Sequence, residues 1–469
     1  MTLAELLKDQ PAPCIIPDAR VKLRKALARD GKHIIVIDDD PTGMQTVQDV
    51  GVFMDWSVDT LRRGLTQPSP VFFVSINSRS LAPAEAKTLA LEVGRNLREA
   101  AVRSKASFLL ASRSDSTLRG HFPYEVDALL TGLGFDPDGI ILAPAFIEAG
   151  RFTVNDIHWA EQQGQLVPVH ETEFARDPMF SFKNSNLKAW VEEKTGGVVA
   201  SKDVMSIPLA LIRRGPDAVA AELQTAANRV PIVVNAAGYA DLDVFSLGLQ
   251  MAESKGKRFV YRCSASFLKS RGGFEDRPLL THEEMVDGSG PGLIVAGSYV
   301  DKSSRQLQRL IDSGLAIPIE LSVDKVVGPD RQDEARRVAT EVDGALKSGT
   351  NAVVYTTRRL RDVSGEDFAQ TGKTIMSALC DAVGSVQTRP SFVVAKGGVT
   401  SIQVAKIALA AREAFALGQI LPGVPVWRLG AESRWPGIAY VVFPGNVGDD
   451  TAVLRAVWTL LGSSGIHQK

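Results

Sequence analysis

The sequence predicts an α/β protein of two domains, each a mostly parallel sheet flanked by helices. Short runs rich in β-branched and other apolar residues alternate with longer helical patterns along almost the whole chain. These runs are continuous rather than alternating with polar residues, which is typical of parallel strands covered on both faces. The chain has 469 residues, enough for two or three domains with separate cores.

Two sets of strands are predicted, one in each half of the chain. The first set is His33–Ile37, Val71–Val74, Ser107–Ala111, Gly139–Ala143, Ile232–Asn235 and Arg258–Tyr261. The second set is Leu293–Ala296, Ile317–Ile319, Ala352–Tyr355, Ser391–Ala395, Val424–Trp427 and Ala439–Phe443. Helical patterns between them include Ala84–Arg103, Ser303–Ser313, Gln332–Lys347, Ser401–Ala416 and Thr451–Leu461.

The stretch 269–291 is the best candidate for a domain boundary. It contains adjacent glycines, two prolines and several charges, and it has no apolar periodicity. We therefore expect an N-terminal extension over residues 1–30, a first α/β domain over 31–270, a linker over 271–291 and a second α/β domain over 292–469. Residues 170–193 mix polar and aromatic side chains, and this irregular composition predicts a flap or an insertion.

Composition excludes several classes of protein. The 53 Lys and Arg against 54 Asp and Glu give a net charge of −1, so no global basic surface for nucleic acid is expected. No apolar run approaches the ~20 residues needed to span a bilayer, and the first 20 residues do not resemble a signal peptide. Three distant cysteines and six scattered histidines fit neither a disulfide framework nor a metal motif, so no residue is assigned as a metal ligand. We expect a cytoplasmic protein with no nucleic-acid or membrane partner.

Three consecutive acids, Asp38-Asp39-Asp40, directly follow the first predicted strand. In open α/β sheets, ligands bind just beyond the carboxyl ends of the strands. The run is either an acidic turn with Pro41-Thr42-Gly43 as its corner or a catalytic or magnesium-binding carboxylate pair. It also fits the D-x-D-x-T pattern of haloacid-dehalogenase-type phosphatases, with Asp38 as the nucleophile. The matching late acidic motif would be Gly448-Asp449-Asp450, about 400 residues away in the other predicted domain, which argues against one composite site.

A second polar segment, Ser112–Gly120, follows another predicted strand. Arg113 and Arg119 could clamp a carboxylate, with nearby hydroxyls binding its other groups. The alternative is that Asp115 caps a helix and Arg119 pairs with a surface acid. Similar polar groups follow two further strands, in Asn77-Ser78-Arg79 and Pro144–Asn155. Four such strand ends favour a polar substrate crevice.

In the second predicted domain, three strands are followed by glycine turns. The three segments that contain such a strand end and its turn are Phe392–Ser401, Phe443–Asp449 and Val295–Tyr299. Each is either a structural joint or an anion cradle made by backbone N–H groups and a helix dipole, and three together favour a nucleotide pocket. Thr371–Thr374 ends like a Walker A loop but has Asp367 at the leading glycine position, so a P-loop is rejected. The chain also lacks a dinucleotide fingerprint and a G-x-S-x-G motif.

Together these motifs resemble the four-carbon acid sugar kinase family, over about residues 33–460. The resemblance rests on Asp39–Gly43, Asp115–Gly120, Pro144–Phe146 with Gly150-Arg151, Gly397–Thr400 and Gly445–Gly448. It implies a sugar-acid site in the N-terminal domain, an ATP site in the C-terminal domain and catalysis in the cleft between them. Characterised members phosphorylate threonate or erythronate with ATP to the 4-phosphate, so the implied cofactors are ATP and Mg²⁺.

The resemblance also assigns residues to roles. The catalytic candidates are Asp39 and Asp115. The substrate-binding candidates are Asp40, Arg79, Arg113, Ser116 and Arg119. The ATP-binding candidates are Ser298, Gly397, Gly398, Val399, Thr400 and Gly445. The chain has Gln45-Thr46 where many relatives have an acid and Arg113 where lysine is common, which leaves the identity of the sugar acid open.

The mechanism expected from these residues is phosphoryl transfer to a terminal hydroxyl of the sugar acid. The two arginines Arg113 and Arg119 hold the substrate carboxylate, unless one of them approaches the γ-phosphate. Either Asp39 or Asp115 accepts the hydroxyl proton. Three other interpretations stay open: a phosphatase that uses Asp38, a nucleotide-dependent dehydrogenase and a non-catalytic sugar-acid-binding protein. A homodimer is compatible with a kinase of this size.

Overall fold

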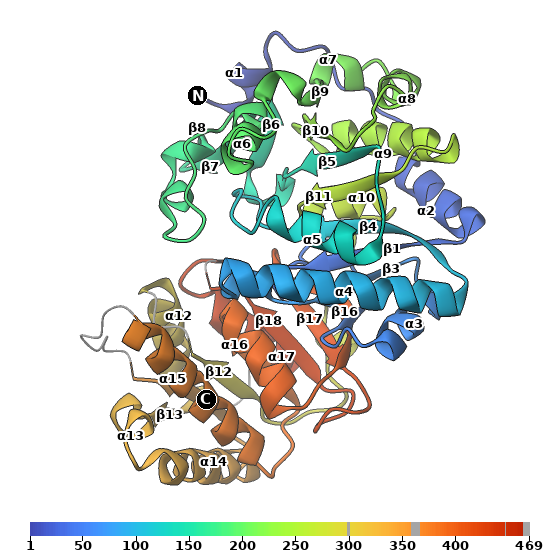
Figure 1. Ribbon diagram of the computed structural model, residues 1–469. Helices are drawn as coiled ribbons and strands as arrows, with labels where there is room; N and C mark the ends of the chain where they lie inside the picture. Colours follow the sequence, from blue (N-terminus) through green and yellow to red (C-terminus); the bar gives the residue numbers. More distant parts are fainter. Residues whose placement is uncertain (298–300, 358–365, 446, 463–469) are drawn as a thin grey trace. The chain divides into compact units, whose positions relative to one another are not determined.

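A computed structural model describes residues 1–297, 301–357, 366–445 and 447–462, with side chains of 366–369 excepted. The chain forms two compact units, Met1–Asp276 and Arg277–Lys469, whose elements are labelled in Figure 1. The predicted α/β fold, with mostly parallel sheets flanked by helices, is confirmed. Within the residues described, no helix has the length and apolar character needed to cross a bilayer.

The first unit is built on a parallel sheet with the strand order β2-β3-β1-β4-β11-β5-β10-β9. Its strands are β1 (Lys32–Asp38), β2 (Val50–Phe53), β3 (Val71–Ser75), β4 (Ser107–Arg113), β5 (Gly139–Ala143), β9 (Met205–Ile207), β10 (Val230–Val234) and β11 (Phe259–Cys263). Its helices are α1 (Leu3–Leu7), α2 (Ala19–Asp30), α3 (Val58–Thr66), α4 (Pro83–Ser104), α5 (Tyr124–Leu133), α6 (Leu187–Lys194), α7 (Leu209–Ile212), α8 (Pro216–Leu223), α9 (Tyr239–Ser254) and α10 (Ala265–Arg271).

The order of these strands creates a switch point at β1. The chain leaves β1 for β2 and then β3 on one side of it and next forms β4 on its other side, so the connections after β1 and β4 lead in opposite directions. Such a point leaves a crevice at the carboxyl ends of the strands, where ligands bind in doubly wound sheets.

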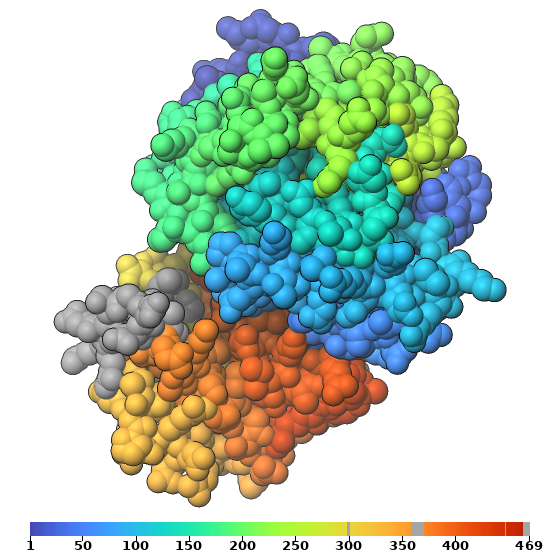
Figure 2. Space-filling view, viewed as in Figure 1, coloured from blue at the N-terminus to red at the C-terminus, as the bar shows by residue number. Residues whose placement is uncertain are grey.

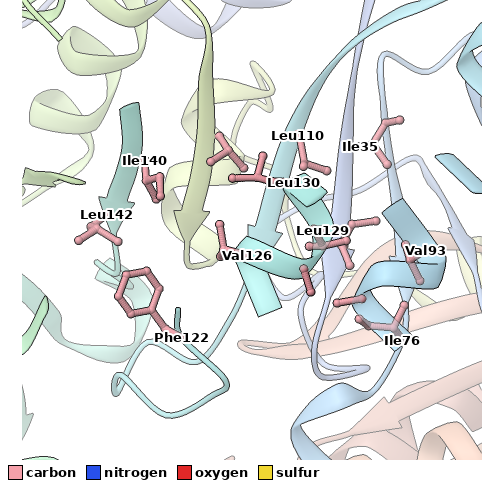
Figure 3. Close-up of a cluster of buried hydrophobic side chains, with 14 of the residues drawn as sticks. Ile35, Ile76, Val93, Leu110, Phe122, Val126, Leu129, Leu130, Ile140 and Leu142 are labelled. Atoms are coloured by element: carbon pink, nitrogen blue, oxygen red, sulfur yellow. The ribbon is translucent and has the colours of Figure 1, made fainter. Parts of the chain in front are cut away.

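One hydrophobic core of this unit lies between the sheet and helices α3, α4 and α5. Ile35 of β1 and Leu110 of β4 are buried against Val93 of α4 and Leu129 of α5 (Figure 3). Burying each such side chain contributes about 1.5–3 kcal/mol. In the space-filling view, α4 and its side chains form the surface over this part of the sheet (Figure 2).

A small antiparallel sheet interrupts the first unit after β5. It consists of β6 (Arg151–Val154), β7 (Ile157–Gln162) and β8 (Gln165–Pro168). Two 3₁₀ turns, Val169–Glu171 and Glu173–Arg176, follow β8 before α6. The irregular segment 170–193 is therefore mostly short turns and α6.

The second unit has the strand order β13-β14-β12-β15-β18-β17-β16, parallel from β13 to β18 and antiparallel from β18 to β16. Its strands are β12 (Leu293–Ala296), β13 (Ala316–Leu321), β14 (Asn351–Thr356), β15 (Phe392–Lys396), β16 (Glu413–Leu421), β17 (Val424–Leu429) and β18 (Ala439–Phe443). Its helices are α11 (His282–Met285), α12 (Asp301–Asp312), α13 (Val323–Val327), α14 (Arg331–Lys347), α15 (Glu366–Ser385), α16 (Gly398–Gln403), with a π-helical turn Val404–Ala408, and α17 (Ala452–Leu461).

The helix predicted over Ser401–Ala416 is wrong in its second half. The helical run ends after the π-helical turn, Ala410 has a left-handed φ of 52°, and β16 begins at Glu413. Alternate residues of β16 are buried, and Ala416 pairs with Trp427 of β17. Pairing and burial of one face override the helix propensity of the local Ala, Arg and Glu residues.

Candidate functional site

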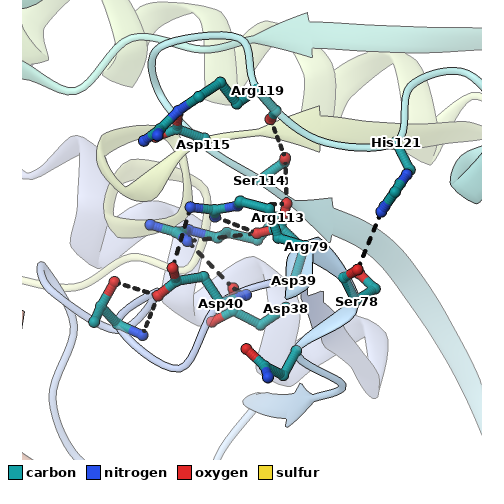
Figure 4. Close-up of polar contacts among 12 residues, drawn as sticks. Asp38, Asp39, Asp40, Ser78, Arg79, Arg113, Ser114, Asp115, Arg119 and His121 are labelled. Carbon is teal, nitrogen blue, oxygen red and sulfur yellow. Dashed lines mark hydrogen bonds and ion pairs between the residues drawn. The ribbon is translucent and has the colours of Figure 1, made fainter. Parts of the chain in front are cut away.

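The sheet of the first unit brings the predicted polar segments to one edge. Asp38 ends β1, and in the sheet register it lies between Ser75 of β3 and Arg113 of β4. The turns after these strands therefore lie side by side, and Figure 4 shows their acidic and basic side chains pointing toward one another. The crevice predicted at these strand ends thus contains a dense network of charged groups.

Arg79 joins two of the three consecutive acids. Its Nη2 donates to Asp39 Oδ1 at 2.5 Å and its Nε donates to Asp39 Oδ2 at 3.3 Å. Its Nη1 donates to Asp40 Oδ2 at 3.1 Å. The two carboxylates raise the pKa of Arg79 further above its usual range, even though burial acts in the opposite direction. Arg79 is therefore a fixed cation that holds the turn after β1.

Asp39 is enclosed on every side. Its side chain is 0% exposed. Besides Arg79, it accepts a hydrogen bond from Ser114 Oγ at 2.5 Å and lies 3.8 Å from Arg113 Nη1. Asp39 therefore holds the side chains of Arg79 and Ser114 in place and has no contact with solvent.

Asp38 differs from its neighbour because its charge is poorly compensated. Burial raises the pKa of Asp38 to about 8, against the opposing effect of Arg113, whose Nη1 lies 3.4 Å from Asp38 Oδ1. Gly43 packs directly on the same carboxyl group, so that a Cβ there would lie 1.7 Å from Asp38 Oδ2. A nucleophile must be ionised and reachable, and these surroundings disfavour the phosphatase that would use Asp38.

Asp115 is the most open of the candidate catalytic carboxylates. Its side chain is 13% exposed, and it lines a small cavity of about 20 Å³ with Ser114, Arg262 and Trp190. Although burial opposes it, the charges of Arg79 and Arg119 and a hydrogen bond from Thr117 hold the pKa of Asp115 well below its usual range. Asp115 is therefore an ionised carboxylate.

Arg119 is held between Asp115 and the irregular segment after β8. Its Nε donates to Asp115 Oδ2 at 2.6 Å, and its Nη1 lies 3.6 Å from Asp177 Oδ2. Its guanidinium lies over the ring of Phe174, 5.0 Å from the centroid. At 25% exposure, Arg119 is a cation that a substrate carboxylate could approach.

The small sheet β6–β8 also contacts the loop after β4 that contains Ser116. His158 of β7 is buried, and its Nε2 lies 2.7 Å from the Ser116 carbonyl oxygen while its Nδ1 lies 3.0 Å from Thr153 Oγ1. Burial lowers the pKa of His158 to about 4, so the ring is neutral at pH 7. The neutral ring donates from Nε2 to the Ser116 carbonyl and fixes the course of the loop.

Two buried charged residues of this site were missed by sequence analysis. Arg262 lies in β11, and its Nη2 would be 2.8 Å from a Cβ at Gly120. Glu125, in the first turn of α5, accepts a hydrogen bond from Ser78 Oγ, and burial raises its pKa to about 7. Arg262 could have been selected from the sequence because it is an arginine within an otherwise apolar strand. Nothing in the sequence distinguishes Glu125 from other helical glutamates.

Several buried polar atoms at this edge have no hydrogen-bond partner among the residues that the structure describes. They are Asp38 Oδ2, Ser75 Oγ, Ser112 Oγ, Arg113 Nε, Glu125 Oε1, Arg262 Nη1 and Ser264 Oγ. Buried polar groups are normally paired, so such a concentration is typical of a place where polar ligand atoms or water complete the network.

The second unit brings together two of its predicted glycine turns. Gly397 has φ 109°, and its N–H donates to the Phe443 carbonyl at 2.8 Å. Lys396, which sequence analysis did not select, is buried, and its Nζ donates to the carbonyls of Pro444 at 2.6 Å and Gly445 at 3.1 Å. Burial, with a smaller effect of Lys302, lowers the pKa of Lys396 to about 7. A lysine with no carboxylate partner in the described chain suits a site for anionic phosphates.

The other residues predicted to bind ATP include three that follow the turn between β15 and α16. Gly398 begins α16, Thr400 is buried in it, and Val399 is 49% exposed. Ser298 lies outside the described residues. In the first unit, the predicted residues Asp39, Asp40, Arg79, Arg113, Asp115, Ser116 and Arg119 lie at the strand-end edge.

Among the residues described, no group of three or more His, Cys, Asp or Glu side chains is arranged to hold a metal ion. Asp39, Asp40 and Asp115 are instead bound to arginines. With these carboxylates bound to arginines, the acidic run as it stands does not fit a resident magnesium site.

Both units match the models of known protein families. Residues 34–271 match the model of a sugar-binding N-terminal domain, and residues 293–453 match that of a nucleotide-binding C-terminal domain. The chain is 29% identical to a D-erythronate kinase of Heliobacterium modesticaldum over 321 residues, 66% of this chain and 67% of that one. It is 30% identical to a D-threonate kinase of Bordetella bronchiseptica over 165 residues, 34% of this chain and 38% of that one.

A solved structure of a Haemophilus influenzae protein shares the fold. It matches with a TM-score of 0.63 and 18% identity, and the match covers 91% of this chain and 100% of that one.

Proposed function

Because this chain belongs to the four-carbon acid sugar kinase family, we propose that it transfers the γ-phosphoryl group of ATP to a small sugar acid. The acceptor is the terminal hydroxyl of an erythronate- or threonate-like acid, and the product is the 4-phosphate. The observation that carries this proposal is the cluster of arginines and carboxylates at the strand ends of the sugar-binding unit.

The acceptor binds at that cluster. Arg119 pairs with the substrate carboxylate, because its guanidinium is part-exposed and is already oriented by Asp115 and Phe174. Hydroxyl groups of the acid hydrogen-bond to the unpartnered polar atoms at the strand ends, such as Arg113 Nε. An arginine-rich site of this kind selects an acid over a neutral sugar.

Asp115 accepts the proton, whereas Asp39 is a positioning residue. Asp115 is ionised and faces the cavity, while Asp39 is fully buried and holds Arg79 and Ser114. The acceptor oxygen forms a bond to the γ-phosphorus as the bond from that phosphorus to the bridging oxygen breaks. The hydroxyl proton passes to Asp115, and ADP leaves.

The donor ATP binds at the glycine turns of the second unit. Backbone N–H groups in the first turn of α16, which begins at Gly398, and the ammonium of Lys396 supply donors for its phosphates. Mg²⁺ bound to the nucleotide neutralises phosphate charge.

The test is ADP release with Mg²⁺ and ATP across D-erythronate, D-threonate and L-threonate. We expect acid-dependent ADP release and a phosphorylated acid in the ³¹P spectrum. Asp115→Asn should lower kcat by about 10²- to 10⁴-fold with the KM for ATP unchanged. The matched control is Asp127→Asn, on an exposed carboxylate of the same unit, and it should retain full turnover.

Two results separate the two parts of the proposal. No acid-dependent ADP release with any of these acids would contradict the function. Acid-dependent turnover that survives in Asp115→Asn would keep the function and remove Asp115 as the proton acceptor.

A further inference from the structure

A second, larger cavity lies in the first unit at the opposite edge of the sheet. It has a volume of about 420 Å³. Its lining includes Lys32, Ser107 and Phe259, the first residues of β1, β4 and β11. The candidate site lies at the other ends of these strands, roughly 15–20 Å away at ~3.3 Å per residue. The two sites therefore share strands but no residues.

Apolar side chains form the walls of this cavity. They come from the carboxyl-terminal part of α4, the end of α5 and the starts of β4 and β11, and include Val102, Phe108, Leu133 and Phe135. Val102 is 70% exposed, an unusual position for a large apolar side chain beside other apolar groups. The volume is within the range of about 300–1,000 Å³ found for small-molecule sites.

The charged side chains that line the cavity are all basic, although the Asp138 carboxylate lies beside it and accepts a hydrogen bond from the backbone N–H of Arg258. Lys32, Arg98, Lys257 and Arg258 line it, and none of the lining residues is acidic. Lys257 lies 3.5 Å from Asp138. For Lys32, Arg98 and Arg258, the described part of the chain contains no carboxylate within ion-pair distance. In a chain of net charge −1, this local excess of positive charge attracts an anion.

One of these cations is also held in place over an aromatic wall. The Arg258 guanidinium lies over the ring of Phe135, 5.3 Å from the centroid. Arg98 approaches the end of α5, where its Nη1 would lie 3.3 Å from a Cβ at Gly134. An apolar space bordered by cations fits a molecule with a flat apolar body and a single anionic group.

We propose that this cavity is a second ligand site, which binds a small organic anion with an apolar ring and one carboxylate. The ring lies against Phe108 and Phe135, and the carboxylate pairs with Arg98 and Arg258. The site is separate from the proposed kinase site, and it is expected whether or not the chain phosphorylates a sugar acid.

The probe is 1-naphthoate, with neutral 1-naphthamide as the matched ligand, titrated calorimetrically into the full chain. We expect saturable 1:1 binding of 1-naphthoate and at least tenfold weaker binding of 1-naphthamide, because the amide lacks the charge. Arg98→Ala should weaken 1-naphthoate about tenfold, and Ala101→Trp, which fills the cavity, should abolish binding. The control Arg103→Ala removes an exposed arginine of α4 that pairs with Glu99 and does not line the cavity, and it should bind as the wild type does.

The sugar-acid site could also bind a carboxylate, so a further variant distinguishes the two. Binding at the second cavity should persist in Arg119→Ala and in saturating D-erythronate. The proposal is overturned by absence of saturable binding up to millimolar 1-naphthoate. It is equally overturned by binding that survives both Arg98→Ala and Ala101→Trp, or by binding that is lost in Arg119→Ala.

Discussion

Asp38, Asp39 and Asp115 carry the same functional group, and their neighbours give them different roles. Asp115 has cations on two sides, which keep its pKa well below the usual range despite burial. Asp39 has no exposed surface and is bound to Arg79 and Ser114. Asp38 is buried and accepts long hydrogen bonds from Arg113 Nη1 and the Asp40 backbone N–H on one oxygen only, and burial raises its pKa to about 8. Charge state and exposure, rather than residue type, therefore distinguish the three carboxyl groups.

The raised pKa of Asp38 predicts a pH-dependent stability. An aspartate has a pKa near 4 in the unfolded chain, so the folded protein holds this proton more tightly. The stability from protonated Asp38 is fully present below about pH 4 and is lost as the pH rises through about 8. Asp38→Asn stays neutral, so its free energy of unfolding should improve relative to wild type as the pH rises.

Urea unfolding of both proteins at pH 5, 7 and 9 tests this. The matched control is Asp127→Asn, which removes an exposed carboxylate of the same unit. A difference between wild type and Asp38→Asn that stays constant from pH 5 to 9 would show that Asp38 is ionised throughout.

At the scale of elements, the segment after β8 completes the first site. Phe174 and Asp177 come from the turns before α6, and both lie against Arg119. A neighbouring 3₁₀ turn and the small sheet position them, while His158 fixes the Ser116 loop. This segment therefore determines how the Arg119 guanidinium is oriented.

Loss of the Asp177 carboxylate is expected to change the KM for the sugar acid but not the KM for ATP. Asp177→Asn should raise the KM for the sugar acid about three- to tenfold, because Arg119 loses one of its two anionic partners. The KM for ATP should not change. Steady-state kinetics in both substrates measures this, with exposed Asp203→Asn as the control. A rise in the KM for ATP would place Asp177 elsewhere in the mechanism.

The turn between β15 and α16 depends on the backbone freedom of glycine. Gly397 has φ 109° and ψ 137°, a conformation that other residues adopt only with strain. Gly397→Ala should therefore cost about 1–3 kcal/mol in the free energy of unfolding and raise the KM for ATP. Thermal unfolding and kinetics measure the two effects. Gly349→Ala, at a positive-φ glycine with open space around it, controls for backbone strain alone, and an equal KM for ATP in both variants would contradict the role.

At the scale of the whole molecule, the two units carry separate chemistry. Arginines and carboxylates converge in the first unit, and glycine turns with a buried lysine converge in the second. Each ligand should therefore be lost by variants in one unit only.

Calorimetry with single ligands tests this division. Arg119→Ala should abolish binding of the sugar acid and leave binding of a non-hydrolysable ATP analogue unchanged. Lys396→Met should do the reverse, because it removes the ammonium from the Pro444–Gly445 turn. Loss of both ligands in either variant, with the fold intact by circular dichroism, would contradict separate sites.

The sequence by itself determined the fold class, the family and the strand ends where polar groups gather. Continuous apolar runs encode buried parallel strands locally, and the side chains after β1, β3 and β4 must share one edge once those strands are parallel. For that reason, the position of Asp39, Arg79 and Arg119 at this edge could be predicted from the sequence.

Only the tertiary structure decided which of these groups are buried, paired or open. The contacts of Asp177, Glu125 and Arg262 join segments far apart in the sequence, and burial depends on packing from all sides. The strand β16 shows the same limit, since its local residues favour a helix and only pairing with β17 makes it a strand. Long-range contacts and desolvation, which no local pattern encodes, set the charge state and role of each residue.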